Sequence, residues 1–211
     1  MFKENIKYLI KMKIFLISAS IIFTVVVIFQ SFIMVAVNKT EEQKYTVILK
    51  DQNFEIRFYP SATLATISSD AKTYKEMSGS EFRKLAGYIF GGNETATHIP
   101  MTAPVHIDIN DTLSTMSFVM PSSYIKENLP KPNDSGIQLK TTDDEYVAVI
   151  QFGGFASDKD FKYYSGKLLN ILKDKGIITL GHPRYLGYNP PYQLVGRRNE
   201  IIVTVDWKPI K

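Results

Sequence analysis

The longest apolar stretch of the chain runs from Ile14 to Val37 and contains no charged side chain. As an α-helix rising about 1.5 Å per residue it is about 36 Å long, which exceeds the roughly 30 Å hydrocarbon core of a bilayer. The pattern therefore predicts a transmembrane helix over residues 14–37, after a basic segment (1–13) and before a linker (38–43). Its polar interruptions are Ser18, Ser20, Thr24, Gln30 and Ser31.

The charges on either side of this stretch predict its orientation, because cytoplasmic flanks of membrane helices carry an excess of lysine and arginine. Four lysines and one glutamate precede it, whereas two lysines and two glutamates follow it closely. We therefore expect a single-pass signal-anchor with residues 1–13 in the cytoplasm and residues 44–211 outside it, in the periplasm or extracellular. The alternative is a cleaved signal peptide, but its apolar region would have about 7–15 residues and a small-residue cleavage site. Val35–Val37 fits such a site poorly, and both readings export the domain.

Two helices are predicted after this segment. The first follows Ser78–Glu81, which has the S-x-x-E form of a capping box, and ends at Gly91-Gly92. The second begins near Ser157 and ends at Gly176. Their apolar positions repeat at helical spacing, namely Phe82, Leu85, Ala86, Ile89 and Phe90 in the first and Phe161, Tyr164, Leu168, Ile171 and Leu172 in the second.

Short β-prone segments surround the two helices. Residues 62–120 and residues 146–207 each follow the order strand, helix, strand, strand, although no sequence repeat relates them. The pattern predicts an α+β domain of two similar halves, with a largely antiparallel sheet and two helices. Tyr146–Phe152 is apolar on both faces and should be central, and a sheet buried on both sides can curl into a barrel. The predicted strands are Tyr45–Lys50, Phe54–Tyr59, Ala62–Ser69, Val105–Ile109, Ser114–Met120, Ile137–Lys140, Tyr146–Phe152 and Ile201–Trp207.

Charge and composition exclude several classes of function. Beyond Lys13 the chain has 21 basic and 20 acidic residues, so the domain offers no basic stripe and we expect no nucleic-acid partner. Cysteine is absent, which excludes disulfides, a thiol nucleophile and thiolate metal sites. The sequence also lacks G-x-S-x-G, G-x-x-x-x-G-K-[ST], G-x-G-x-x-G and H-E-x-x-H.

The face of the first helix opposite Phe82 and Ile89 is a candidate binding surface. A glycine inside a helix costs about 1 kcal/mol relative to alanine. One reason to accept that cost is the close approach of a flat ligand to the backbone. The alternative is that the glycine packs against a strand and the cations are solvated. The residues predicted to share this face are Ser80, Arg83, Lys84, Gly87 and Tyr88.

A second candidate surface is the loop before the last strand, with Tyr188, Pro190, Pro191 and Tyr192. Proline and aromatic side chains make a stiff apolar wall that loses little entropy on binding. The alternative is an ordinary turn held by packing of tyrosine on proline. The nearby Arg197, Arg198 and Glu200 are expected to form a structural ion-pair group.

Three histidines complete the candidates. His106 shares a strand face with Asp108, opposite Val105 and Ile107, which indicates a solvated side. His182 and His98 lie in predicted turns or loops. Each of the three could supply a single axial donor to a metal.

Five motifs resemble those of the SOUL heme-binding protein family, in order and at similar spacing, from Lys44 to the C-terminus. The resemblance implies a distorted antiparallel β-barrel flanked by two helices and built by duplication. It also implies non-catalytic, non-covalent binding of heme or a related tetrapyrrole between the two candidate surfaces, with Arg83 and Lys84 on the propionates. The motifs are Phe54–Pro60, Leu85–Asn93, Ile99–Val105, Gln151–Phe155, and Gly187–Pro191 with Arg197–Glu200.

The chain departs from part of this family at Phe58, where some relatives carry a histidine proposed as axial ligand. The metal ligand is therefore left unknown, with Tyr88 as one substitute. Two other functions stay open: an effector-type domain that binds another amphipathic ligand, and a hydrolase with Glu81 or Glu94 as base. The hydrolase ranks lower because no carboxylate pair or nucleophile–base spacing supports it. A structural scaffold is also open.

Overall fold

The computed structural model describes residues 2–208, with side chains from residue 7 onward. It divides into two compact units, one made of Met1–Lys39 and Pro191–Val195, the other of Thr40–Pro190 and Gly196–Lys211. Met1 and residues 209–211, the ends of the predicted N-terminal segment and of the predicted domain, lie outside the described residues.

The first unit contains α1 (Phe2–Asn38), a continuous helix of 37 residues. Residues Lys7–Asn38 of α1 are long and apolar enough to cross a membrane. Two of the polar interruptions are satisfied within the helix, because the hydroxyls of Thr24 and Ser31 each donate to a carbonyl four residues earlier, at 2.9 Å. These side chains therefore do not oppose a membrane-spanning role.

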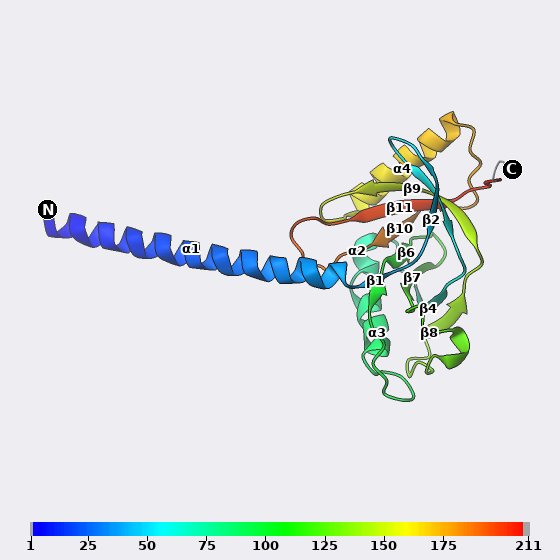
Figure 1. The fold of residues 1–211 in the computed structure, drawn as a ribbon, viewed down its shortest axis with the longest axis horizontal. Coiled ribbons are helices and arrows are strands. Elements are labelled where there is room, and N and C mark those ends of the chain that lie inside the picture. The colour runs from blue at the N-terminus through cyan, green and yellow to red at the C-terminus, as the bar shows by residue number, and fades with distance from the viewer. Residues whose placement is uncertain (1, 209–211) are drawn as a thin grey trace. The chain divides into compact units, whose positions relative to one another are not determined.

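The second unit is built on one nine-stranded antiparallel sheet (Figure 1). Its strand order is β2-β3-β9-β11-β10-β6-β7-β4-β8, so β2 and β8 are its edges. The linker predicted for residues 38–43 contains a further strand, β1 (Glu41–Glu42), which pairs in parallel with β5 (Thr102–Ala103). The strands of the large sheet are β2 (Thr46–Lys50), β3 (Glu55–Tyr59), β4 (Thr63–Ser69), β6 (Val105–Asp108), β7 (Ser114–Val119), β8 (Ile137–Thr141), β9 (Glu145–Phe152), β10 (Arg184–Gly187) and β11 (Asn199–Thr204).

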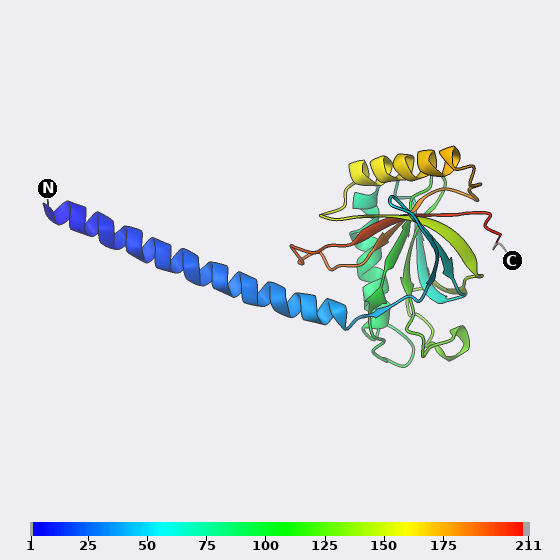
Figure 2. The ribbon, with the colours of Figure 1, turned by 45° about the horizontal axis from the view of Figure 1, so that its top comes forward.

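The sheet confirms the predicted pair of halves. One half follows the order β4-α3-β6-β7 and the other β9-α4-β10-β11, and they meet where β6 pairs with β10. The strand before each half crosses to the other one, since β3 pairs with β9 and β8 pairs with β4. The sheet curls into a half-barrel with open edges (Figure 2). The predicted α+β barrel-like fold is therefore confirmed.

Both predicted helices are present, as α3 (Ser80–Ile89) and α4 (Asp158–Asp174). Ser157 caps α4 by accepting a hydrogen bond from the backbone of Asp160. The capping box predicted for α3 is wrong. Ser78 instead closes a short helix that the sequence did not predict, α2 (Tyr74–Met77), and the N-cap of α3 is Gly79, which makes no side-chain bond.

The main hydrophobic core lies between the large sheet and the helices α3 and α4. β9 contributes to both faces of the sheet: Ala148 and Ile150 face the main core, while Val147 and Val149 belong to a smaller cluster on the face without helices. β9 is bonded to β3 on one side and β11 on the other. Its predicted place inside the sheet is confirmed.

The end of α3 is set by two glycines. Gly91 has a φ of +103°, which favours glycine, and the backbone N–H of Gly92 donates to the carbonyl of Gly87 at 2.8 Å. A Cβ on Gly92 would lie 2.7 Å from that same oxygen. The turn leaves Phe90 60% exposed, so its predicted place in the buried stripe is wrong. Phe90 follows Gly87 by three residues and therefore lies near it on the exposed face.

Candidate functional site

Four of the five residues predicted on the exposed face of α3 lie there: Ser80, Arg83, Lys84 and Gly87. Apart from its chain neighbours and the backbone of α3 itself, no heavy atom of the described residues lies within 4 Å of an ideal Cβ built on Gly87. Gly87 therefore does not pack against a strand, which was the alternative explanation for it. The backbone of α3 is open to a ligand at this point.

Tyr88 does not lie on this face, and its predicted position is wrong. Its side chain is 1% exposed, and its hydroxyl donates to the carbonyl of Pro130 at 3.0 Å. Burial, together with nearby Tyr124, raises the pKa of Tyr88 to about 12. At about 100° per residue, Tyr88 is displaced about 80° from Ser80 around the helix, which places it on the flank that packs inward. It therefore cannot serve as a donor on the exposed face.

The two cations of α3 differ in their partners. Lys84 Nζ lies 3.2 Å from Glu81 Oε2, and Ser80 donates to Glu81 Oε1 at 2.9 Å. Within residues 7–208, no side-chain hydrogen bond or ion pair is found for Arg83. Arg83 can therefore meet an anionic group without breaking an existing contact, whereas Glu81, one of the two bases considered for a hydrolase, is already engaged.

The exposed face of α3 continues into a contact that the sequence did not predict. The rings of Phe90 and His98 lie 5.2 Å apart between centroids with an interplanar angle of 32°, and the two residues form an isolated β-bridge. His98 is exposed. The turn at Gly91-Gly92 brings the loop back to the helix end, and it was the only signal in the sequence for this contact. The surface thus has cations along it and two exposed rings at its C-terminal end.

The second predicted wall is not one surface. Tyr188 is buried on the helix-free face of the sheet, and Pro190 O accepts a hydrogen bond from Arg197 Nη1 at 2.6 Å. Pro191 and Tyr192 belong to the compact unit that contains α1. The predicted exposure of Tyr188 as a binding wall is therefore wrong, because Tyr188, directly after β10, packs its ring into the smaller hydrophobic cluster.

A charged cluster that holds Tyr188 lies on the helix-free face, centred on the fully buried carboxylate of Glu200. Arg57 donates to both Glu200 oxygens, at 2.9 and 3.1 Å. Arg198 Nε donates to Oε1 at 3.0 Å, and the Tyr188 hydroxyl donates to Oε2 at 2.8 Å. Burial of Arg57 opposes its charge, but the Glu200 carboxylate outweighs this effect and raises the pKa of the guanidinium. One carboxylate thus joins β3, β11 and the residue that follows β10.

This cluster confirms the predicted Arg198–Glu200 pair and corrects its membership. Arg57, 143 residues before Glu200, is the partner that the sequence did not reveal. Arg197 lies apart from it, with its guanidinium 4.4 Å from the centroid of the Phe155 ring. The cluster is a structural connection between strands, as predicted for the pair.

His106 lies on the helix-free face with Asp108, but that face is not simply solvated. Its Nε2 lies 2.7 Å from Gln43 Oε1, in the segment that follows α1 along the chain. Burial, with a smaller effect of Arg184, lowers the pKa of His106 to about 3. His106 is half-buried, so its predicted solvation is only partly right: Gln43, directly after β1, contacts its ring.

This burial predicts a pH-dependent stability. The folded chain keeps His106 neutral down to about pH 3, while the unfolded chain binds a proton below about pH 6.5. The free energy of unfolding should therefore fall by up to about 1.4 kcal/mol per pH unit as pH is lowered through that window. We expect His106→Asn to flatten this decline in denaturant titrations of the detergent-solubilised chain. His98→Asn, at an exposed histidine, is the control; an unchanged slope in His106→Asn would contradict the assignment.

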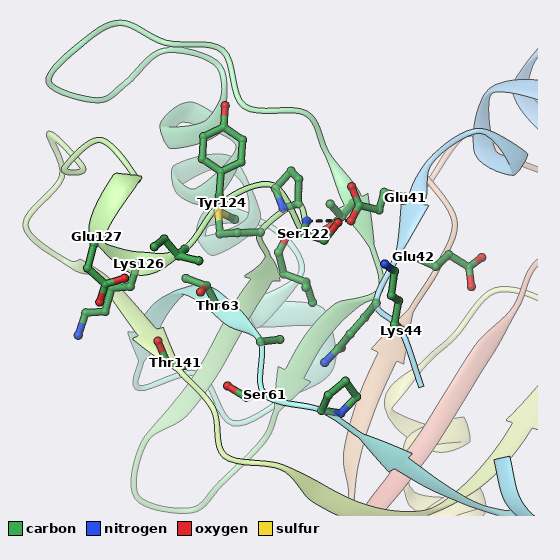
Figure 3. A pocket seen from close by; sticks show the side chains of 18 residues that line it. Glu41, Glu42, Lys44, Ser61, Thr63, Ser122, Tyr124, Lys126, Glu127 and Thr141 are labelled. Atoms are coloured by element: carbon green, nitrogen blue, oxygen red, sulfur yellow. Dashed lines mark hydrogen bonds between the residues drawn. The ribbon is translucent and has the colours of Figure 1, made fainter. Parts of the chain in front are cut away.

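A cavity of about 430 Å³ lies elsewhere on the same unit (Figure 3). This volume falls within the range of small-molecule sites. Glu42 and Lys44 line one side, and Lys126 and Glu127 line the opposite side. The carboxylate of Glu41 accepts a hydrogen bond from the backbone of Ser122 at 2.8 Å and so holds the wall together. None of the nine predicted site residues lines this cavity.

In the described part of the chain, no three histidine, aspartate or glutamate side chains gather as a metal-chelating site requires. Glu94, the other base considered for a hydrolase, accepts a hydrogen bond from the backbone of Lys131 at 3.2 Å. The α3 face and the cavity are two candidate ligand surfaces.

Comparison with known proteins decides the family. The family model described as SOUL heme-binding protein matches residues 40–204. The chain belongs to the SOUL family. Heme-binding protein 1 of Xenopus laevis is 30% identical over 155 residues, which cover 70% of this chain and 81% of that protein. Heme-binding protein 2 of Homo sapiens is 29% identical over 167 residues, covering 75% of this chain and 81% of that protein.

Solved structures extend the likeness of the SOUL domain at the level of fold. The EcmrR C-terminal domain has a TM-score of 0.57 at 10% identity and covers 78% of this chain and 99% of its own. A hydrolase from Listeria innocua has a TM-score of 0.51 at 10% identity, covering 75% and 94%. At such identities the likeness shows a shared architecture alone.

Proposed function

We propose that this chain is a membrane-anchored module that binds heme or a related tetrapyrrole without catalysing a reaction. Its membership in the SOUL family supports the ligand class, and the curated relatives are named heme-binding proteins. The single observation that supports this site is the open backbone at Gly87, on the same exposed face as the guanidinium of Arg83.

The residues of α3 fit such a ligand. A planar macrocycle can approach the helix at Gly87, where no side chain intervenes, and the guanidinium of Arg83 can form charge-assisted hydrogen bonds to a propionate. Lys84 would add a second cation by leaving Glu81. Phe90 and His98 would contact the edge of the ligand at the end of the helix, and His98 offers an imidazole nitrogen. The bound group would supply the metal and its redox chemistry.

The proposed setting is a single membrane span formed by α1, with residues 1–13 in the cytoplasm and the SOUL domain on the other side. The length and apolarity of Lys7–Asn38 support the span, and the lysines before it support the orientation. A protease added to right-side-out membrane vesicles should therefore digest the domain. Protection of the domain in such vesicles, with digestion after they are opened by detergent, would indicate the opposite orientation.

Hemin titration of the detergent-solubilised chain tests the ligand and its site. We expect a saturable shift of the Soret band. The affinity for hemin should fall by about tenfold or more in the double variant Arg83→Ala/Lys84→Ala, since charge-assisted hydrogen bonds contribute roughly 1.5–3 kcal/mol each.

The matched control is Lys44→Ala/Lys126→Ala, which removes two cations at the cavity instead. It should leave the titration unchanged. If only the cavity variant loses affinity for hemin, the binding site is at the cavity and not on α3. If the unmodified chain shows no saturable shift, heme is rejected as the ligand.

A further inference from the structure

A loop of the chain forms one compact unit with the apolar helix α1. Residues Pro191–Val195 group with Met1–Lys39, and the side-chain amide of Gln30 holds them. Its Nε2 donates to Tyr192 O at 3.1 Å, and its Oε1 accepts from the backbone N–H of Leu194 at 2.9 Å. Both ends of one amide are therefore used to fix the loop on the helix.

Among the side chains of α1 that the structure describes, from residue 7 onward, only Gln30 and Ile33 are buried. Gln30 and Ile33 are 9% and 7% exposed, whereas Phe29 and Phe32 beside them are 55% and 71% exposed. An amide inside an apolar helix is unfavourable in lipid unless it is hydrogen-bonded. Unlike Ser31, which bonds to its own helix, Gln30 is satisfied by the loop.

The loop directs apolar side chains outward. Pro191–Val195 contains no charge, and Tyr192, Leu194 and Val195 are 58%, 52% and 56% exposed. Gln193, in contrast, is 2% exposed, and its Nε2 donates to Val195 O at 2.9 Å. A loop made for water would show the opposite arrangement, so this one is suited to an apolar or interfacial medium.

The position of Gln30 along α1 indicates how deep in the bilayer the loop Pro191–Val195 can lie. The helix of 37 residues is about 55 Å long, and a hydrocarbon core is only about 30 Å thick, so part of α1 lies outside that core. Gln30 precedes Asn38 by eight residues, or about 12 Å of helix. Irregular backbone exposed to lipid is not tolerated within the core. The loop can therefore lie no deeper than the interface, and Gln30 marks that level.

We propose that Tyr192, Leu194 and Val195 enter the headgroup region of a phospholipid bilayer beside α1, as a second membrane contact of this chain. The inference rests on the proposed anchoring by α1. Tyrosine at this level agrees with the preference of aromatic side chains for the interface. The hydrocarbon then ends near Gln30 instead of Val37, so the span moves toward the N-terminus relative to residues 14–37, and Lys11 and Lys13 extend their ammonium groups to the opposite headgroups.

The absence of cysteine allows a direct test by single labelling. The full chain is reconstituted in vesicles of phosphatidylcholine and phosphatidylglycerol with a bimane label at Leu194→Cys, Phe23→Cys or Tyr163→Cys. The label at 194 should be quenched by a nitroxide near the top of the acyl chain and shielded from aqueous iodide. The label at 23 should be quenched by a nitroxide near the end of the acyl chain. The label at 163, on the exposed side of α4, should respond to iodide.

The three labels separate the two ideas. Iodide quenching at 194 with lipid quenching at 23 would overturn the loop contact and keep the anchor, whereas iodide quenching at 23 would overturn the anchor itself. Gln30→Leu should transfer the label at 194 from lipid to iodide quenching. Ser31→Ala, which removes a hydroxyl bonded within the helix, should not. Unchanged lipid quenching in Gln30→Leu would contradict the role of the amide.

Discussion

Glu200→Gln is expected to lower the free energy of unfolding by about 3–5 kcal/mol, because it removes the buried charge that the buried Arg57 shares with the half-buried Arg198. Each arginine keeps a second carboxylate, Glu55 for Arg57 and Glu42 for Arg198, but both of these are partly exposed. Denaturant titration of the detergent-solubilised chain, followed by circular dichroism, measures the change.

The control for this prediction is Asp51→Asn, which breaks a solvent-exposed ion pair with Lys175. Exposed pairs contribute about 1 kcal/mol or less, so this variant should unfold nearly as the unmodified chain does. A loss of similar size in the two variants would mean that the Glu200 cluster is no more important than a surface pair. In that case β3 and β11 would be held by their hydrogen bonds and hydrophobic contacts alone.

Gly87→Leu is expected to weaken hemin binding by about tenfold or more while it stabilises the fold. Leucine is a better helix former than glycine by up to about 1 kcal/mol, Gly87 is exposed, and a Cβ added there meets no neighbouring element within 4 Å. The same side chain would lie where the macrocycle is proposed to approach the backbone. Opposite signs for stability and binding would separate a ligand surface from a packing position.

Gly166 provides the matched control, because it is an exposed glycine within α4 with no heavy atom of the described residues near its Cβ position. Gly166→Leu should stabilise the chain by a similar amount and leave the hemin titration unchanged. Equal loss of hemin binding in both variants would point to a general effect on the fold. Unaltered binding in Gly87→Leu would remove α3 as the proposed site.

The helices and strands were largely predictable because their signals are local. The spacing of Phe82, Leu85 and Ile89 is recorded within ten residues and requires no knowledge of the partner surface. The failures arose where two local signals competed. Ser78 resembles an N-cap for α3, but it is the C-cap of α2. The N-cap of α2 is Thr73, whose side chain accepts a hydrogen bond from the backbone of Glu76.

The site was predictable only in part. The repeat of Ser80, Arg83, Lys84 and Gly87 identified an exposed face, because these residues lie close together around the helix. Tyr88 was misplaced since a flank position is buried or exposed according to what packs beside it, here the segment that contains Pro130. His98 was missed as part of the surface because a turn, not a periodic pattern, brings it to Phe90.

By itself the sequence determined the apolar helix, the two amphipathic helices and the repeated order of strands, because hydrophobic periodicity reflects neighbours a few residues apart. The tertiary structure alone decided that β3 and β8 exchange between the halves, that Arg57 meets Glu200, and that Pro191–Val195 joins α1. Those contacts join segments far apart in the chain. Which distant charges and loops meet depends on how the whole chain buries its apolar surface, and no local pattern records that outcome.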